Sequence, residues 1–293
     1  MIKRRNPLVA FFLSLVPGLG QFYNGQLRKG FIILGVDLLY PIVFGFTGLL
    51  SKLSGLVALI VFAIVFILFR MIDGLIEARK LENYEIKKYN KWYFYLAFVA
   101  ILYGVRLILD LPTSTGIQTF RIPTPSMKPA FQPGDRVVAQ FTYYRNRKIE
   151  QGDIVVFNSP KGDIWTFRVI GLPNDSIEVN DGKVSVNGYL NETSRLREYV
   201  ADEQEVIEFD EQLNENKKIK TLRYKNETYS EMSGKFKKMK IPENEYFLMG
   251  DNRDNTYDSR FIGTIKEKDI LGRVIYSYWG NSSDRIGIDF RDR

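Results

Sequence analysis

The sequence predicts an α-helical membrane region at the N-terminus, followed by a mainly antiparallel β-domain. Two observations carry this prediction. Most long apolar runs of the 293-residue chain lie before residue 112. After residue 120 the chain alternates between apolar and polar residues in short segments separated by turn residues, which is typical of strands joined by tight turns. The hydrophobic content of 45% therefore averages over two unlike regions.

The first apolar run covers residues 8–16, follows three basic residues and stops at Pro17-Gly18. It is shorter than the roughly 20 residues that a membrane-spanning helix needs. Its basic flank is also typical of a signal peptide, but no small-x-small cleavage site follows and further apolar runs come after it. We therefore predict a kinked or re-entrant segment over residues 8–25, with anchoring as its simplest role.

Three further runs, at residues 31–50, 55–75 and 92–111, are long enough to cross a bilayer. The last begins with four aromatic residues, as expected at a membrane interface. Basic residues gather at 28–29 and 77–91, which favours the cytoplasmic side for both segments. If the first run does not cross, the last span delivers the rest of the chain to the outer face. The sequence thus predicts a multi-pass protein of the cytoplasmic (inner) membrane, with a membrane region over 1–91 and a last transmembrane helix over 92–111.

The β-domain is expected over residues 115–293. Its predicted strands are residues 136–140, 153–157, 165–170, 176–179, 183–186 and 246–249. Turn sequences such as Pro133-Gly134-Asp135 separate them. Residues 191–240 are highly charged and contain few large apolar side chains, so we expect an exposed hairpin or loop insertion there.

The composition excludes several kinds of chemistry. The chain has no cysteine and no histidine, so no disulfide, no Ser-His-Asp or Cys-His mechanism and no histidine-ligated zinc site can form. We expect no metal and no cofactor. The net charge of +7 is concentrated beside the apolar runs, where it favours contact with membrane lipid. No basic stretch is interleaved with stacking aromatics, so nucleic acid is not an expected partner.

Three segments carry the chemistry, at residues 122–129, 167–175 and 249–260. They read Ile-Pro-Thr-Pro-Ser-Met-Lys-Pro, Phe-Arg-Val-Ile-Gly-Leu-Pro-Asn-Asp and Met-Gly-Asp-Asn-Arg-Asp-Asn-Thr-Tyr-Asp-Ser-Arg. In this order they resemble the signature segments of bacterial signal peptidase I, a membrane serine endopeptidase family of the Ser-Lys type. The resemblance extends from Phe120 to near Trp279, and the run from Gly250 to Arg260 is its most specific part.

The resemblance implies a function and a site. The family cleaves signal peptides from exported preproteins after small-x-small sequences, with a β-domain on the outer (periplasmic or extracellular) face of the membrane. By position, Ser126 would be the nucleophile, and its backbone N–H together with the hydroxyl of Thr124 would hold the oxyanion. The substrate would bind in extended form, as an added strand.

Five further positions match supporting residues of the family. The resemblance pairs Arg168 with Asp251 and Asp258 with Arg260. Thr256 matches a hydroxyl residue that contacts the general base. We expect these side chains to form a buried hydrogen-bonded network that shapes the site.

This chain differs from the family at the position of the general base. A serine hydroxyl needs a neighbour to accept its proton, and the family uses a lysine at the position where this chain has Phe167. Lys161, in a turn, and Lys128, in a segment expected to be exposed, are the remaining amines nearby; Asp258 is the remaining carboxylate. Two hypotheses follow: a signal peptidase with a displaced base, or a non-catalytic homologue that binds signal peptides or membrane partners.

Overall fold

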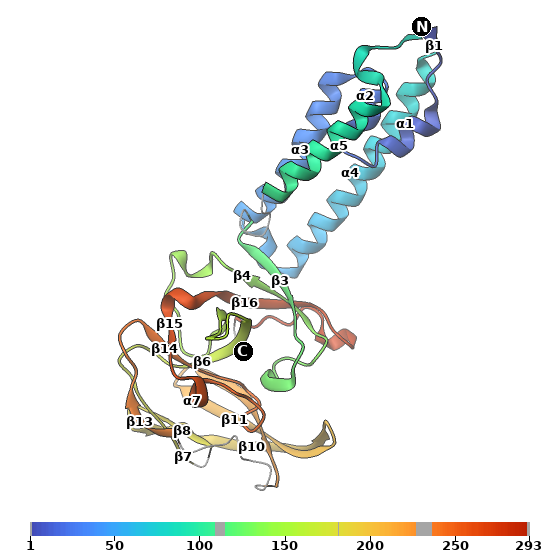
Figure 1. Cartoon of the computed structure of the whole chain (residues 1–293). Coiled ribbons are helices and arrows are strands. Elements are labelled where there is room, and N and C mark those ends of the chain that lie inside the picture. The colour runs from blue at the N-terminus through green and yellow to red at the C-terminus, as the bar shows by residue number, and fades with distance from the viewer. Residues whose placement is uncertain (1, 109–114, 181, 227–235, 292–293) are drawn as a thin grey trace. The chain divides into compact units, whose positions relative to one another are not determined.

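The chain folds into two units, residues 1–116 and 117–293 (Figure 1). The computed structural model describes residues 2–108, 115–180, 182–226 and 236–291. The first unit is helical and the second consists mainly of antiparallel strands, so the fold class predicted from the sequence is confirmed.

In its described residues, the first unit contains five helices and a short ribbon. The helices are α1 (Pro7–Leu13), α2 (Leu19–Tyr23), α3 (Leu27–Phe46), α4 (Leu53–Lys80) and α5 (Trp92–Ile108), with 3-10 turns η1 (Leu49–Ser51) and η2 (Lys88–Asn90) and paired strands β1 (Ile2–Lys3) and β2 (Tyr84–Glu85). By length and composition, α3 and α4 could each cross a membrane, and the apolar stretch of α5 is shorter. Residues 109–111 of the expected last span lie outside the described residues.

The predicted re-entrant segment forms α1 and α2, two short helices joined at a sharp break. Asn6 caps α1 by accepting bonds from the amides of Leu8 and Val9. After α1 the chain turns through Gly18, whose φ of +78° favours glycine. A Cβ at Gly18 would also lie 2.4 Å from the carbonyl oxygen of Gly30 in α3, so this break depends on close backbone packing.

Polar side chains attach this segment to the long helices. Arg70 of α4 forms a buried ion pair with Asp37 of α3, with Nη1 to Oδ1 at 2.9 Å. Its Nη2 donates to the carbonyl oxygen of Leu15 at 2.9 Å, just past the end of α1. Gln21 and Asn24 donate to backbone carbonyls of α4. These contacts satisfy polar groups that would be costly to bury alone in an apolar surrounding.

The second unit is built on a seven-stranded antiparallel sheet of order β15-β14-β6-β5-β16-β4-β3. Its strands are β3 (Ile117–Arg121), β4 (Arg136–Gln140), β5 (Ile154–Asn158), β6 (Ile164–Gly171), β14 (Glu245–Met249), β15 (Ile265–Lys266) and β16 (Ile270–Trp279). The short helical elements are η3 (Pro125–Met127), η4 (Tyr143–Arg145), α7 (Ser259–Ile262), η6 (Glu267–Asp269) and η7 (Ser283–Arg285). A core of valine, isoleucine and phenylalanine side chains lies inside the curled sheet.

Two smaller sheets complete the unit. One has the order β13-β7-β8-β9, with β13 (Phe236–Lys240), β7 (Ser176–Asn180), β8 (Lys183–Val186) and β9 (Tyr189–Leu190). The other has the order β10-β11-β12, with β10 (Thr193–Ala201), β11 (Gln204–Asn214) and β12 (Lys217–Tyr224). We refer to this second one as the inserted sheet.

The inserted sheet occupies most of the charged stretch for which we expected a hairpin or loop. Its strands are nine, eleven and eight residues long. β10 is largely exposed, whereas β11 and β12 bury Val206, Ile219 and Leu222. The charged residues alternate with these apolar ones, and the alternation, more than the charge, determines that the stretch forms strands.

Candidate active site

Ser126 lies on a short 3-10 turn, η3, directly after β3 has left its partner strand. Pro125 starts the turn, and Met127 anchors it by burying its side chain in the core of the β-domain. The Ser126 side chain remains partly exposed. Among the residues that the structure describes, the Thr124 hydroxyl is the one group within hydrogen-bonding distance of Ser126 Oγ, at 3.3 Å.

The segment after β14 fixes the backbone of this turn. Asn252 donates its amide to the carbonyl oxygen of Ser126 at 3.0 Å, and its side-chain Nδ2 to that of Pro125 at 3.2 Å. Thr256 Oγ1 lies 2.9 Å from the same Ser126 oxygen. A Cβ at Gly250 would lie 2.6 Å from that oxygen, so only glycine allows this approach. Asn252 was not singled out from the sequence, although it lies inside the most specific run.

Arg168 and Asp251 form a buried ion pair behind the turn. The guanidinium binds the carboxylate through two bonds, from Nε at 2.8 Å and from Nη2 at 2.7 Å, and both side chains are at most 2% exposed. The third donor, Nη1, reaches the carbonyl oxygen of Gly152. Such a two-bond geometry determines position as well as charge balance.

Asp258 and Arg260 form a second pair of the same kind. Arg260 donates from Nε and Nη2 to the two carboxylate oxygens at 2.8 Å each. The amide of Gly250 donates to Asp258 Oδ2 at 3.0 Å. Both carboxylate oxygens of Asp258 accept hydrogen bonds, and the side chain is fully buried. Asp258 therefore does not act as the proton acceptor for Ser126.

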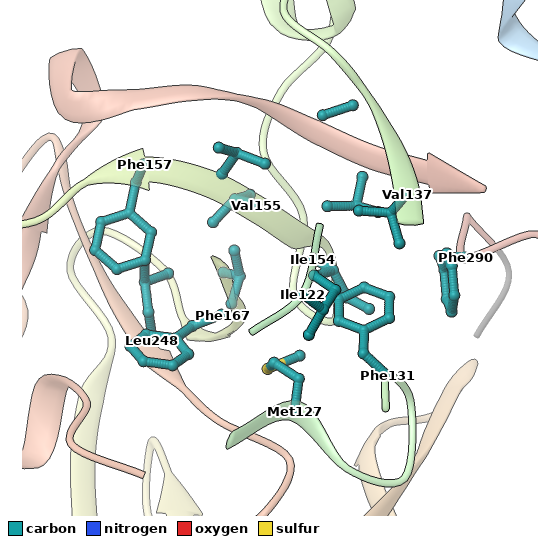
Figure 2. Close-up of a cluster of buried hydrophobic side chains, with 14 of the residues drawn as sticks. Ile122, Met127, Phe131, Val137, Ile154, Val155, Phe157, Phe167, Leu248 and Phe290 are labelled. Atoms are coloured by element: carbon teal, nitrogen blue, oxygen red, sulfur yellow. The ribbon is translucent and has the colours of Figure 1, made fainter. Parts of the chain in front are cut away.

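Phe167, at the position where the resemblance would place the general base, lies on β6 and belongs to the hydrophobic core. Its residue is 6% exposed, and its ring centroid lies 5.7 Å from that of Phe157 and 5.9 Å from that of Trp165. Figure 2 shows the ring among the core side chains, near Leu248 and Met127. A hydrocarbon ring cannot accept a proton, so β6 contributes shape and not acid-base chemistry here.

The two lysines considered as substitutes are placed differently. Lys128 is not exposed as expected: its side chain is 15% exposed, and its Nζ lies 2.9 and 2.8 Å from the two carboxylate oxygens of Asp202 in the inserted sheet. Lys161 is exposed in the turn between β5 and β6 and does not line the pocket at Ser126. No pattern in the sequence indicates the contact with Asp202, 74 positions away.

A pocket of about 440 Å³ opens beside Ser126. Its lining comes from two extended segments, 120–124 at the end of β3 and 163–167 at the start of β6, together with Ser126, Met127 and Tyr257. In the described part of the chain, β3 is an edge strand, and β14 pairs with β6 only from Arg168 onward. Both segments therefore present unpaired backbone edges across an apolar pocket, an arrangement suited to an extended peptide.

Burial is the main cause of the pKa shifts of two charged residues, Asp254 and Arg223. Asp254 accepts a bond from the amide of Tyr224 at 2.8 Å, and burial raises the pKa of its carboxyl group although arginines lie nearby. Burial, with the neighbouring Arg253, lowers the pKa of the Arg223 guanidinium. Within the described residues, no cluster of three or more acidic side chains that could hold a metal ion is present.

Comparisons with known proteins agree on one family. A family model described as "Signal peptidase, peptidase S26" matches residues 92–279. A probable signal peptidase I-2 of Synechocystis is 30% identical over 188 residues, 60% of this chain and 72% of the relative. Signal peptidase IB of Staphylococcus aureus is 29% identical over 163 residues, 56% of this chain and 78% of the relative. A crystal structure of a signal peptidase I from Enterococcus faecalis is 26% identical, covers 43% of this chain and 97% of its own, and superposes with a TM-score of 0.27.

Proposed function

This chain belongs to the peptidase S26 family of signal peptidases, and we propose that Ser126 is its nucleophile. The family is one of serine endopeptidases, and its function is the cleavage of signal peptides. The observation that carries the proposal is that Ser126 lies, with Thr124 beside it, on the wall of a pocket with two open strand edges. The proposed substrates are exported preproteins.

Substrate binding follows from the shape of the pocket. A signal peptide in extended form would add a strand between segment 120–124 and residues 164–167 of β6. The aromatic and aliphatic lining, which includes Ile122, Trp165 and Phe167, leaves room for small side chains next to Ser126. This fits cleavage after a small-x-small sequence.

In the chemical step, Ser126 Oγ attacks the scissile carbonyl carbon. The negative oxygen that forms is stabilised by the backbone N–H of Ser126 and by the Thr124 hydroxyl, which rotates away from Ser126 Oγ to donate. The serine proton must pass to a base. If Lys128 is that base, its ion pair with Asp202 must open first, whereas Lys161 would need its whole turn to move.

A second candidate function is favoured by one observation, the buried ring of Phe167. A general base typically contributes roughly 10²–10⁴-fold to the rate. Without it, the same pocket would bind signal peptides or membrane partners and release them uncut. The chain would then act as a non-catalytic homologue that retains the groove.

The proposed location is the cytoplasmic membrane, with several spans and the β-domain on the outer face. Two helices, α3 and α4, have the length and apolar character for spanning, and many of their large apolar side chains are exposed. Arg28 and Lys29 at the start of α3, and Arg79 and Lys80 at the end of α4, support a cytoplasmic position for that end of the unit.

A cleavage assay separates the two functions. The full chain in detergent is incubated with a preprotein, and the wild type is compared with Ser126→Ala and Phe167→Lys. Cleavage by the wild type that Ser126→Ala abolishes supports the peptidase and excludes the pure binding protein. Cleavage by Phe167→Lys alone excludes the peptidase, and binding of a fluorescent signal peptide by the uncleaving wild type then supports the second function.

A further inference from the structure

We propose that the inserted sheet positions Ser126, and that Asp202, in the turn between β10 and β11, is a positioning residue of the site. The inference rests on the proposed role of Ser126. It assigns a function to a region that the sequence marks only as a charged insertion. Two independent sets of contacts join this sheet to the Ser126 turn, one through a side chain and one through the backbone.

The side-chain contact is the ion pair between Asp202 and Lys128. Lys128 follows Ser126 by two residues, at the end of η3. Both carboxylate oxygens of Asp202 lie within 2.9 Å of Lys128 Nζ. The lysine side chain is mostly covered, whereas Asp202 is 55% exposed. The aspartate is therefore an accessible group acting on a chain segment that is itself packed.

Asp202 lies in a tight two-residue turn. Asp202 and Glu203 have φ values of +48° and +64°, and the flanking residues Ala201 and Gln204 pair across the hairpin. Positive φ at both central positions defines a type I′ turn, which usually requires glycine or asparagine. Aspartate tolerates this conformation, but glutamate does so poorly. The paired strands therefore determine where the backbone of Asp202 lies, within reach of Lys128.

The backbone contact runs through β12. The amide of Leu222 donates to the carbonyl oxygen of Asp251, and the amide of Arg253 donates back to Leu222, both at 2.9 Å. Between them, Asn252 donates to the carbonyl oxygen of Ser126. A buried ion pair between Arg253 and Glu211 of β11, at 2.7 Å, adds a second attachment.

These contacts constrain the Ser126 turn from both sides. Asn252 binds the carbonyl of Ser126 itself, and Asp202 binds the side chain two residues later. The Ser126 N–H, the proposed oxyanion donor, lies in the same turn. Because a shift of about 1 Å in a reacting group can cost 10²-fold in rate, fixing this turn is a catalytic requirement as well as a structural one.

The test compares two charge-neutralising substitutions one residue apart. Asp202→Asn removes the ion pair but keeps the side-chain shape and the tolerance for positive φ. Glu203→Gln removes the same charge from the same turn and serves as the matched control. Lys128→Met removes the other partner. All variants are made in the full chain in detergent, and thermal unfolding confirms that each is folded.

The first measurement is amide hydrogen exchange over residues 124–130, which needs no cleavage activity. We expect Asp202→Asn and Lys128→Met to raise exchange about threefold, because the attraction of a partly exposed ion pair is lost, and Glu203→Gln to leave it unchanged. The double variant should exchange no faster than either single one. Equal exchange in Asp202→Asn and Glu203→Gln would overturn the inference.

The second measurement is cleavage of a preprotein, in the wild-type background if that cleaves and in the Phe167→Lys background otherwise. A positioning role predicts that Asp202→Asn lowers kcat with little change in KM, and that Glu203→Gln changes neither. An unchanged or raised kcat contradicts the inference, and a raised kcat would support Lys128, freed from Asp202, as the base. If neither background cleaves, the proposed function has failed, and the hydrogen exchange result still decides whether the sheet positions the turn.

Discussion

The two walls of the pocket at Ser126 differ in what stabilises them. The Ser126 wall is fixed by hydrogen bonds, among them that of Asn252 to the Ser126 carbonyl, and by the ion pair that Asp251 forms with Arg168, the residue of β6 just past the pocket. The β6 wall is fixed by apolar packing, with Phe167 against Phe157 and Trp165. A buried polar network cannot lose one member cheaply, because the partner is then left unpaired.

Position 167 belongs to no such polar network, so replacing an amine there would leave no buried partner unpaired. A neutral lysine in an apolar site opposes stability, since burial penalises its charged form and the amine needs a partner. A phenylalanine at the same place fills the core and needs none. If Ser126 is the nucleophile and position 167 is that of the base, as we propose, folding stability favours the setting of the serine but not an amine beside it.

The largest effect is expected on the cleavage rate, when an amine is placed at position 167 of the β6 wall. If the Ser126 wall is intact, Phe167→Lys should raise the rate of preprotein cleavage by roughly 10²–10⁴-fold, the usual contribution of a general base. Initial rates in detergent measure it. Phe167→Met, which is flexible and lacks an amine, is the control. Equal rates for the two variants would show that the Ser126 wall has also lost its competence.

The next effect tests the polar wall. Arg168→Met should lower the free energy of unfolding of the β-domain by about 3–5 kcal/mol, because Asp251 is then left buried without a partner. Replacing Asp251 by leucine in the same chain should recover part of the loss. Arg136→Met, on an exposed position of β4, is the control. Denaturant titration followed by tryptophan fluorescence gives the values, and a loss under 1 kcal/mol would mean that the ion pair adds little.

A smaller effect is expected on the free energy of unfolding, because an amine at position 167 is costly to bury. Phe167→Lys should unfold at lower denaturant concentration than Phe167→Met, by about 2 kcal/mol, because an amine beside Phe157 and Trp165 has no partner there. The difference should shrink as pH rises and the folded state takes up the neutral amine. If Phe167→Lys is as stable as Phe167→Met, our explanation for an apolar side chain at position 167 is wrong.

The smallest effect concerns Asp254 on the polar wall. Burial raises the pKa of its carboxyl group in the folded state, so folding favours the protonated form. Its contribution to stability is present below the unfolded pKa of about 4 and is lost as pH rises through the folded value. Asp254→Asn should therefore gain stability relative to the wild type as pH increases from 4 to 7. A constant difference across that range would contradict the pKa shift.

Much of the fold was predictable because strands are encoded locally. The alternating segments at 136–140 and 176–179 form β4 and β7, and the fold class and the family are both confirmed. The contact between Lys128 and Asp202 was not predictable, because it joins a charged hairpin to a turn 74 residues away. Asn252 was missed for another reason: its task is performed by its backbone and by a side-chain amide whose partners are carbonyls.

The glycines of the first unit illustrate the same limit. Gly18 and Gly20 lie in a glycine-rich segment, residues 17–25. No periodic pattern in that segment indicates which residues the glycines contact. The structure gives the reason: a Cβ at Gly20 would lie 1.8 Å from Ser14 Oγ, and one at Gly18 would meet the backbone of α3. The glycines of this segment therefore allow close packing against neighbouring residues. The sequence alone predicts only an anchoring role for the segment.

The opening of Ser126 onto the pocket has a practical consequence in a chain that contains no cysteine. Ser126→Cys would create the only thiol of the molecule, at the point where a substrate carbonyl must pass. A cysteine is a few per cent thiolate at neutral pH even without a partner base. Its alkylation rate would therefore report how accessible the nucleophile is, and slowing by a peptide would report occupancy.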